Sequence, residues 1–206
     1  MAKEVHYNSK DHISADSAPD PYNRPAFSLG NRLRRLFWNI CWLLFYRTSP
    51  RPFHPWRSMI LRSFGAKVGA NCHFYPSSRV HSPWNLVCDS EVTAGDDVEL
   101  YNPAPLHLGS HVIISQGAYI CGATHNFDEA DFPLLTYAME IGPYAWVCAR
   151  ACVGPGVKIG EGAVLGLASV ATKNLEAWTV YAGAPAVRVK ERQKHVIQFE
   201  RMNGNP

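Results

Sequence analysis

The sequence predicts an all-β fold: a left-handed parallel β-helix of about five coils, with an N-terminal helical extension and a short C-terminal helix. Two periodic features predict it. From residue 68 onward an aliphatic residue recurs every six positions, and a small residue tends to follow four positions after it. Six residues suffice for one short strand and one turn, so each repeat returns an aliphatic side chain to the interior of a narrow triangular prism. Such coils turn left-handed, a known exception to the usual right-handed crossover.

The six-residue phase runs from Val68 to Val98, resumes at Leu108 after an insertion around 102–107, and resumes at Ile141 after a second insertion. Three repeats make one coil, and the resulting five coils would stand roughly 24 Å tall at the usual strand spacing. Glycine often follows the aliphatic residue, where we expect a tight turn that a Cβ would obstruct. The aliphatic positions are Val68, Phe74, Val80, Leu86, Val92, Val98, Leu108, Ile114, Ile120, Ile141, Val147, Val153, Ile159, Leu165 and Ala171.

The chain divides into four expected parts. Residues 1–30 are a polar, proline-broken lead that we expect to be flexible, and residues 31–65 form the helical extension. Residues 66–186 form the β-helix domain. Residues 187–206 form a C-terminal helix and tail, with the helix over roughly 187–202.

The segment 31–46 lacks helix breakers and is predicted as a helix, and a second helix over 55–64 begins with a proline in its first turn. The apolar part of the first helix is shorter than the ~20 residues that span a bilayer. One interpretation packs this helix on the β-helix or on a neighbouring subunit. The other places it at a membrane surface, because aromatic residues flanked by arginines suit the headgroup region. The sequence leaves both open.

Composition excludes several classes of protein. A net charge of +3 is too weak to indicate a nucleic-acid partner. The N-terminal residues contain no secretory signal, so we expect a cytoplasmic protein with reduced thiols, peripheral to the inner face of the membrane if the first helix contacts lipid. The spacing of the cysteines does not match a zinc ribbon. They are Cys41, Cys72, Cys88, Cys121, Cys148 and Cys152.

Several motifs that do not follow the repeat occur in a characteristic order. They are Asn102-Pro-Ala-Pro-Leu-His-Leu-Gly109, Ile114-Ser-Gln-Gly-Ala-Tyr-Ile-Cys121, Thr124-His-Asn126, Ile141-Gly-Pro-Tyr-Ala-Trp-Val147, Val153-Gly-Pro-Gly-Val-Lys-Ile-Gly-Glu-Gly-Ala-Val164, Ala171-Thr-Lys173 and Tyr181-Ala-Gly-Ala-Pro185. With these motifs, residues 64–189 resemble the hexapeptide-repeat acetyltransferases, and most of all the colanic-acid-biosynthesis type. The resemblance implies transfer of an acetyl group from acetyl-CoA to a hydroxyl of a saccharide or glycan precursor, in surface or exopolysaccharide biosynthesis.

His125 lies where the six-residue phase breaks, and it matches the catalytic histidine of that family. An imidazole titrates near neutral pH, which suits a general base that takes a proton from a hydroxyl. Asn102 matches a polar position that faces the acceptor sugar, and Tyr101 replaces an acidic residue usual in the subgroup. Asn126 stands where relatives often have aspartate, so Asp128, Glu129 or a backbone carbonyl is expected to orient the imidazole.

Seven residues match or suit the coenzyme slot that the family forms along the prism edge. The tryptophan lines the slot, the alanines leave room for the pantetheine arm, the threonine–lysine pair meets amides and phosphates, and the last two cations suit the 3′-phosphate. A backbone amide near 146–148 is a candidate oxyanion donor. The seven residues are Trp146, Ala149, Ala168, Thr172, Lys173, Arg188 and Lys190.

The resemblance also implies a homotrimer with active sites between subunits, and we expect a saccharide acceptor and no metal. The γ-class carbonic anhydrases share the fold and bind zinc through histidines, two of them five residues apart. Here the pairs His73/His81 and His107/His111 are eight and four apart, which does not match. Two alternatives stay open: an acetyltransferase for serine or an amino sugar, and a non-catalytic β-helix scaffold.

Overall fold

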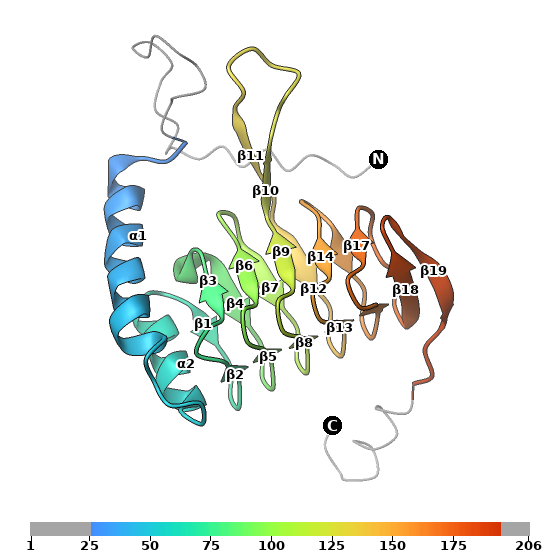
Figure 1. Ribbon diagram of the computed structural model, residues 1–206, viewed down its shortest axis with the longest axis horizontal. Helices are drawn as coiled ribbons and strands as arrows, with labels where there is room; N and C mark the ends of the chain where they lie inside the picture. The colour runs from blue at the N-terminus through green and yellow to red at the C-terminus, as the bar shows by residue number, and fades with distance from the viewer. Residues whose placement is uncertain (1–25, 195–206) are drawn as a thin grey trace.

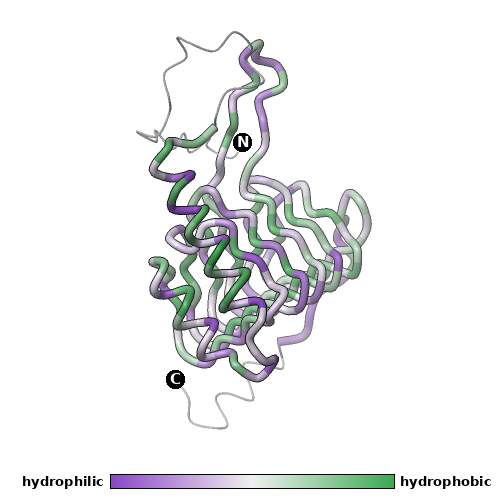
Figure 2. Tube along the Cα trace, turned by 60° about the vertical axis from the view of Figure 1, so that its left-hand side comes forward, coloured by the Kyte–Doolittle hydropathy of each residue, from purple (hydrophilic) through white to green (hydrophobic). Residues whose placement is uncertain are grey.

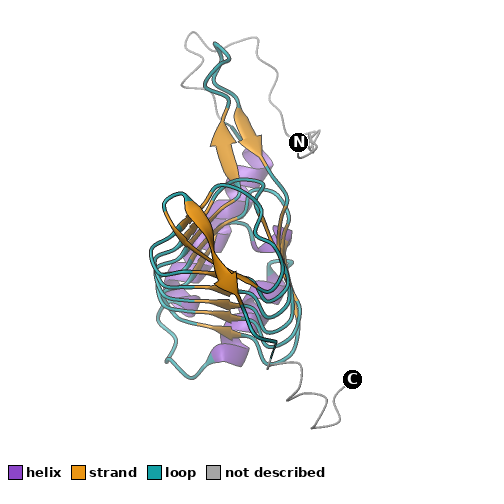
Figure 3. Ribbon diagram, turned by 90° about the vertical axis from the view of Figure 1, so that its right-hand side faces the viewer, coloured by secondary structure: helices purple, strands orange, loops and turns teal. Residues whose placement is uncertain are grey.

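The computed structural model describes residues 26–194, and within them the chain coils into a left-handed parallel β-helix with helices at one end (Figure 1). Three walls form a triangular prism, seen end-on in Figure 3. Sheet A consists of β1 (Lys67–Val68), β4 (Leu86–Cys88), β7 (Leu106–Leu108), β12 (Met139–Ile141) and β15 (Lys158–Ile159). Sheet B consists of β2 (His73–Phe74), β5 (Thr93–Ala94), β8 (Ile113–Ile114), β13 (Trp146–Val147), β16 (Val164–Leu165), β18 (Thr179–Gly183) and β19 (Ala186–Glu191). Sheet C consists of β3 (Arg79–Val80), β6 (Glu99–Tyr101), β9 (Tyr119–Cys121), β14 (Cys152–Val153) and β17 (Val170–Ala171).

Successive strands occupy the three walls in turn, so that β1, β2 and β3 make the first coil. Five complete coils end at β17, and a sixth continues with a bridge between Leu175 and Ile159 and with β18 beside β16. The predicted fold is confirmed, with about six coils instead of five. The interior aliphatic side chains stack from coil to coil, and Ile114, Ile141 and Leu165 have no exposed surface.

The second coil does not follow the predicted phase. Its strands place Cys88, Ala94 and Leu100 beside the interior residues of the first coil, two positions later than the predicted Leu86, Val92 and Val98. The short 3₁₀ turn η3 (Pro83–Asn85) adds two residues at the corner between sheets C and A. The predicted residues are nevertheless buried, because leucine or valine fills the position where small residues are usual. Burial alone therefore could not reveal the shift.

The predicted helical extension is present as α1 (Leu29–Cys41), a π-helical turn η2 (Trp42–Tyr46) and α2 (His54–Ser63). One face of α1 and η2 packs on the first coil. Trp38 Nε1 donates to Val80 O at 2.6 Å, and Trp42 Nε1 donates to the Ser78 carbonyl at 3.0 Å. These bonds satisfy the polar atoms of two buried indoles, so the helix is held in one position on the first coil.

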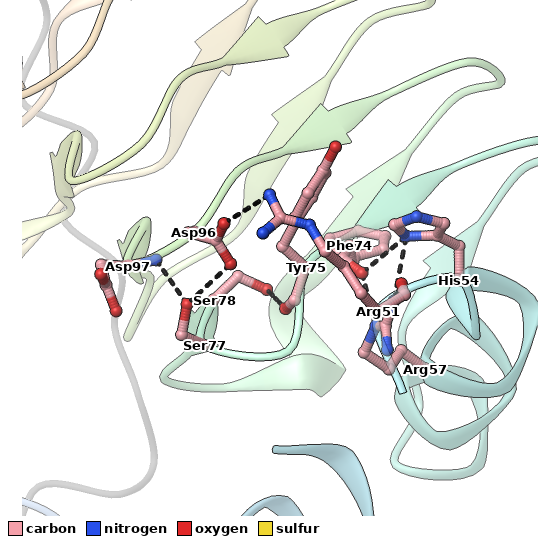
Figure 4. A network of polar contacts seen from close by, with 9 residues as sticks. All are labelled: Arg51, His54, Arg57, Phe74, Tyr75, Ser77, Ser78, Asp96 and Asp97. Atoms are coloured by element: carbon pink, nitrogen blue, oxygen red, sulfur yellow. Dashed lines mark hydrogen bonds and ion pairs between the residues drawn. The ribbon is translucent and has the colours of Figure 1, made fainter. Parts of the chain in front are cut away.

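Helix α2 is anchored by Arg57, whose side chain is completely buried (Figure 4). Its guanidinium donates to the carbonyls of Phe74, Pro50 and Arg51 and to Ser49 Oγ, so carbonyl and hydroxyl oxygens hold it in place of a carboxylate. A buried cation is tolerated only when its donors are satisfied in this way. The network therefore fixes the loop before α2 to the first coil.

The expected C-terminal helix is wrong for residues 187–191. These residues belong to β19, which pairs antiparallel with β18 at the end of sheet B. Val187 and Val189 supply the two-residue alternation of a strand, and the free edge of β18 offers hydrogen bonds that outweigh local helix propensity. Residues 195–202 of the predicted helix, and residues 1–25 of the expected flexible lead, lie outside the described residues.

The glycines that follow the aliphatic residues are required by the neighbouring coil and not by the turn. A Cβ on Gly109 would lie 2.6 Å from the backbone nitrogen of Pro143 in the next coil. The left-handed backbone occurs two positions later, at residues that are mostly not glycine, such as His111 (φ 61°) and Tyr144 (φ 58°). A tight turn is present as predicted, but its left-handed residue lies two positions after the glycine.

This close approach predicts that Gly109→Ala destabilises the fold by about 1–3 kcal/mol, because the added methyl must push two coils apart. Urea unfolding followed by circular dichroism measures the change. The matched control is Gly30→Ala in α1, where an added Cβ meets nothing within 4 Å. That control should be neutral or stabilising by up to about 1 kcal/mol. Equal unfolding free energies for the two variants would contradict the steric explanation.

Candidate functional site

The longest interruption of the coils is a hairpin at the corner between sheets C and A. Strands β10 (Ala123–His125) and β11 (Leu134–Thr136) pair antiparallel, and the hairpin projects from the prism (Figure 1). His125 pairs with Leu134 at the outer end of this ladder, so it stands at the base of the loop 126–133. The predicted break in phase therefore places the candidate base on a projecting arm of a rigid scaffold.

The imidazole of His125 is held in one orientation. Its Nδ1 lies 2.9 Å from Phe132 O, and its ring stacks on the Phe132 ring at 4.5 Å between centroids with an interplanar angle of 11°. A carbonyl oxygen only accepts hydrogen bonds, so Nδ1 carries the proton and the Nε2 lone pair of the neutral ring is directed away from that bond. A backbone carbonyl thus performs the orienting role.

Asn126 organises the loop that supplies this carbonyl. Its Nδ2 donates to Glu129 Oε1 at 2.6 Å, and its Oδ1 accepts from the backbone N–H of Asp128 at 3.2 Å. Its own backbone N–H donates to Pro133 O at 2.9 Å. Asp128 is exposed and joins this turn through its backbone N–H. Asn126, which stands where relatives often have aspartate, therefore stabilises the loop, and the carbonyl of Phe132 orients the imidazole.

Asn102 lies inside the corner and does not face outward. Only 2% of it is exposed, its Oδ1 accepts from Ser82 N at 3.0 Å, and its Nδ2 donates to Ser82 O at 2.9 Å. The amide thus joins the first and second corners between sheets C and A. Tyr101, by contrast, is half-buried on sheet C, with His81 against it at 4.7 Å and Tyr119 parallel to it at 6.5 Å. Burial raises the pKa of Tyr101, so its hydroxyl stays protonated.

Trp146 lies on the outer face of sheet B and is 43% exposed. Its Nε1 donates to Ser115 Oγ at 2.9 Å, which fixes the indole along the wall. Trp146 pairs with Val164, Val164 pairs with Val180, and Val180 pairs with Lys190. Paired residues share a face, so Trp146 and Lys190 lie on one row across the sheet, roughly 14 Å apart at strand spacing.

The other expected coenzyme residues lie on two different corners and on β19. Ala149 and Ala168 stack at the corner between sheets B and C, where Ala168 N donates to Ala149 O at 3.0 Å. Thr172 and Lys173 are exposed at the corner between sheets C and A, directly after β17. Arg188 is exposed on β19, and its Nη2 is 3.2 Å from Glu191 Oε1. The seven residues therefore all lie in the last three coils, but they do not share a single wall.

His125 and Trp146 are on opposite sides of one chain. In a triangular prism, wall B faces the corner between walls C and A, and the hairpin rises from that corner (Figure 3). A site that uses both residues therefore needs two copies of the chain, with the hairpin of one against sheet B of the other.

Sequence reasoning misses most of the residues that support the candidate side chains of His125, Trp146 and Asn102. Ser115 follows an interior isoleucine within one of the motifs, so its role beside Trp146 is within reach of a sequence argument. Phe132 contributes a carbonyl and a ring face that no motif marks, and Ser82 contributes only backbone atoms to Asn102.

No metal site accompanies these residues in the described part of the chain. Across residues 26–194, no group of three or more His, Cys, Asp or Glu side chains is placed to hold a metal ion. The histidines considered for zinc are dispersed: His73 lies against His54, His107 contacts Asp89 at 3.3 Å, and His81 packs on Tyr101.

Comparison with known proteins gives a family. The chain matches no protein-family model. It is 36% identical over 166 residues to WcaF of Escherichia coli (strain K12), named for colanic acid biosynthesis and acetyl transfer, and the match covers 81% of this chain and 91% of that protein. This chain belongs to the hexapeptide-repeat acetyltransferases.

More distant relatives of this acetyltransferase include the galactoside O-acetyltransferase of Escherichia coli (strain K12), 26% identical over 65% of the chain and 60% of that protein. Among solved structures, a maltose O-acetyltransferase from Clostridium difficile 630 superposes with a TM-score of 0.73 and 21% identity over 81% of this chain and 90% of that one. The acetyltransferase VCA0836 from Vibrio cholerae, complexed with acetyl coenzyme A, gives 0.70 and 17% over 81% and 91%. At these identities the structures show a shared fold.

The environment of His81, beside Tyr101, predicts a loss of stability in acid. Burial first, and then Arg35 and Arg79, lower the pKa of His81 from 6.5 to about 4. Between pH 6.5 and pH 4 the unfolded chain therefore binds more protons at this residue than the folded chain, so stability falls as the pH falls through that window. At pH 5 the loss is about 2 kcal/mol.

Urea unfolding of this acetyltransferase at pH 7 and pH 5 measures the effect, and His81→Gln removes the titrating group. The variant should lose less stability between the two pH values than the wild type, by about 2 kcal/mol. An equal loss in both proteins would show that His81 does not titrate in this way.

Proposed function

We propose that the protein transfers an acetyl group from acetyl-CoA to a hydroxyl of a saccharide or glycan precursor in surface or exopolysaccharide biosynthesis. The observation that carries the proposal is the orientation of His125, whose Nδ1 donates to Phe132 O and whose Nε2 is left as a base. The relationship to WcaF supports the polysaccharide context, and two relatives named as galactoside and maltose O-acetyltransferases support a sugar hydroxyl as acceptor.

In the proposed reaction, Nε2 of His125 takes the proton of the acceptor hydroxyl as its oxygen attacks the thioester carbonyl. The new C–O bond forms, the C–S bond breaks, and the coenzyme A thiolate leaves with the proton from the imidazolium. Two of the expected oxyanion donors, the backbone amides of Trp146 and Cys148, do not fit this role. The N–H of Trp146 donates to Ala163 O and that of Cys148 to Leu165 O, both at 2.9 Å, so each already serves the coil ladder. A different donor must stabilise the oxyanion.

The row from Trp146 to Lys190 on sheet B suits the extended coenzyme. The exposed indole at one end offers an apolar surface for the pantetheine arm, and the ammonium at the other end offers a partner for phosphate. Ala149 and Ala168 lie at the corner beside this wall, and their small side chains leave room for the ligand along its edge. Thr172 and Lys173 share the hairpin corner with His125, so they belong to the opposite side of the same chain.

This division of residues supports the expected homotrimer with sites between subunits. Three prisms around a threefold axis would bring the hairpin of each chain against sheet B of its neighbour, and so join His125 to Trp146. We place the enzyme in the cytoplasm, and the six cysteines, all free thiols, support a reducing compartment.

His125→Ala should lower turnover by about 10²–10⁴ while the dissociation constant for coenzyme A changes little, because the imidazole acts on the acceptor proton. Thiol release measures turnover, with galactosides, maltosides and glycan precursors as acceptors, and calorimetry measures coenzyme binding. The control is His73→Ala, which removes an exposed imidazole of the first coil. Turnover close to wild type in His125→Ala would exclude the assignment, and absence of coenzyme binding by the wild type would favour a scaffold.

Mixing two defective chains tests the shared site. Trp146→Ala should raise the KM for acetyl-CoA at least about tenfold with a smaller change in kcat, since the indole contributes binding surface. When His125→Ala and Trp146→Ala chains are unfolded and refolded together, random assembly should restore about a quarter of the intact sites. Activity measured at low acetyl-CoA should rise accordingly. If each site lay within one chain, no activity would return.

A further inference from the structure

Among residues 26–194, the outward side of the helical extension is apolar and exposed. We call it the apolar helical face, and its members are 47–67% exposed. They recur at intervals of three and four residues, so they form one stripe along the helix. A seventh residue, Trp56 of α2, donates from its Nε1 to Phe45 O at 3.0 Å and so adjoins the stripe. The six residues are Leu33, Leu36, Phe37, Ile40, Leu43 and Leu44.

This face is not needed to attach the helix to the prism. The opposite side of α1 and η2 already does so, through Trp38, Trp42 and Tyr46, which are at most 8% exposed. Figure 2 brings the helices to the front and shows apolar and hydrophilic residues alternating along them. A contiguous exposed stripe of large aliphatic and aromatic side chains on a globular fold marks a surface that contacts another apolar phase or a partner.

The charge around the face has one sign. Residues 21–88 contain ten Arg or Lys and no Asp or Glu, although the whole chain has 20 basic and 17 acidic residues. Arg32 and Arg47 are exposed at the two ends of the stripe. Arg51, 68% exposed at its side chain, follows close by and pairs with Asp96 of the second coil at 2.8 Å. Asp96 thus balances Arg51, but no carboxylate of the segment 21–88 balances Arg32 and Arg47. An apolar stripe bordered by cations is complementary to an anionic, amphipathic surface.

The same charges argue against a second copy of the chain as the occupant. Pairing this face with itself would place Arg32 and Arg47 of one copy near the cations of the other, with no acidic residue between 21 and 88 to compensate. The face also lies at the end of the prism opposite β18 and β19, far from the coils that carry the coenzyme row (Figure 1). It is therefore separate from the intersubunit clefts of the proposed trimer.

We propose that the apolar helical face docks on the surface of an anionic lipid bilayer. Helix α1 with η2 would lie in the plane of the interface, its aliphatic and aromatic side chains entering the acyl boundary and its arginines remaining among the headgroups. No helix among residues 26–194 is long and apolar enough to cross a membrane. The proposed contact is a docking on the bilayer surface. The docked enzyme would present its sites to acceptors carried at that surface.

Vesicle flotation with the full-length protein tests the proposal, using phosphatidylcholine vesicles with and without phosphatidylglycerol. Wild-type protein should partition at least about tenfold more strongly onto the anionic vesicles, and added salt should weaken this binding. Phe37→Ser/Leu44→Ser should reduce the partition at least about tenfold, and Arg32→Gln/Arg47→Gln should remove most of the preference for anionic lipid. Circular dichroism and unfolding midpoints establish that both variants fold.

The matched control is Val187→Ser/Val189→Ser on β19, two exposed valines outside the face, which should bind vesicles like the wild type. The proposal is overturned if wild-type protein does not float, if flotation ignores lipid charge, or if the control loses as much binding as Phe37→Ser/Leu44→Ser. It is also overturned if sedimentation shows that the face joins two copies and vesicles do not compete. The two variants test membrane docking and catalysis independently. His125→Ala should still float with the vesicles, and Phe37→Ser/Leu44→Ser should still acetylate a soluble acceptor.

Discussion

Every part of this molecule depends on one coil resting on the next. Parallel hydrogen bonds join equivalent positions in successive coils, and interior aliphatic residues stack beneath them. The spacing between coils is therefore fixed, and residues such as Gly109 and Gly160, where a Cβ would lie within 2.6 Å of the next backbone, leave no freedom to vary it. A walled prism of this kind is rigid along its length, so a side chain on one coil has a definite place relative to all others.

That rigidity explains where variation is allowed. Across residues 67–171, extra residues enter at the corner between sheets C and A in the first three coils, first as η3, then around Asn102, and finally as the β10–β11 hairpin. The walls themselves continue in register past each insertion. The corner can therefore carry the candidate base His125 without disturbing the core, while the opposite wall carries the row from Trp146 to Lys190 that we propose for the coenzyme. The separation of these two functions on one chain is what makes assembly part of the proposed chemistry.

The period of six residues was sufficient to predict the fold, because burial in a narrow prism restricts one position in every repeat. The two helices followed from the lack of breakers, and the position of His125 followed from the break in phase. The phase of the second coil could not be read, since Val92 and Val98 are as apolar as true interior residues and nothing in the sequence marks a two-residue corner turn. The orientation of His125 depends on the carbonyl of Phe132, and a carbonyl has no signature in sequence. Asn102 could be misread for the opposite reason, because this first residue of a motif is expected to face the acceptor and instead bonds the Ser82 backbone inside the corner.

Different elements close the two ends of the repeating coils. At the start of the prism, α1 and η2 cover the first coil with two tryptophans and a tyrosine. At the other end β19 turns back antiparallel along β18, so sheet B finishes on a strand that does not continue the repeat and carries the charged side chains of Arg188, Lys190 and Glu191. An open edge of parallel strands would be a template on which another chain could add its own coils. The reversal at β19 therefore means that sheet B does not end on a parallel strand, and a chain cut before residue 186 would expose β18 as such an edge.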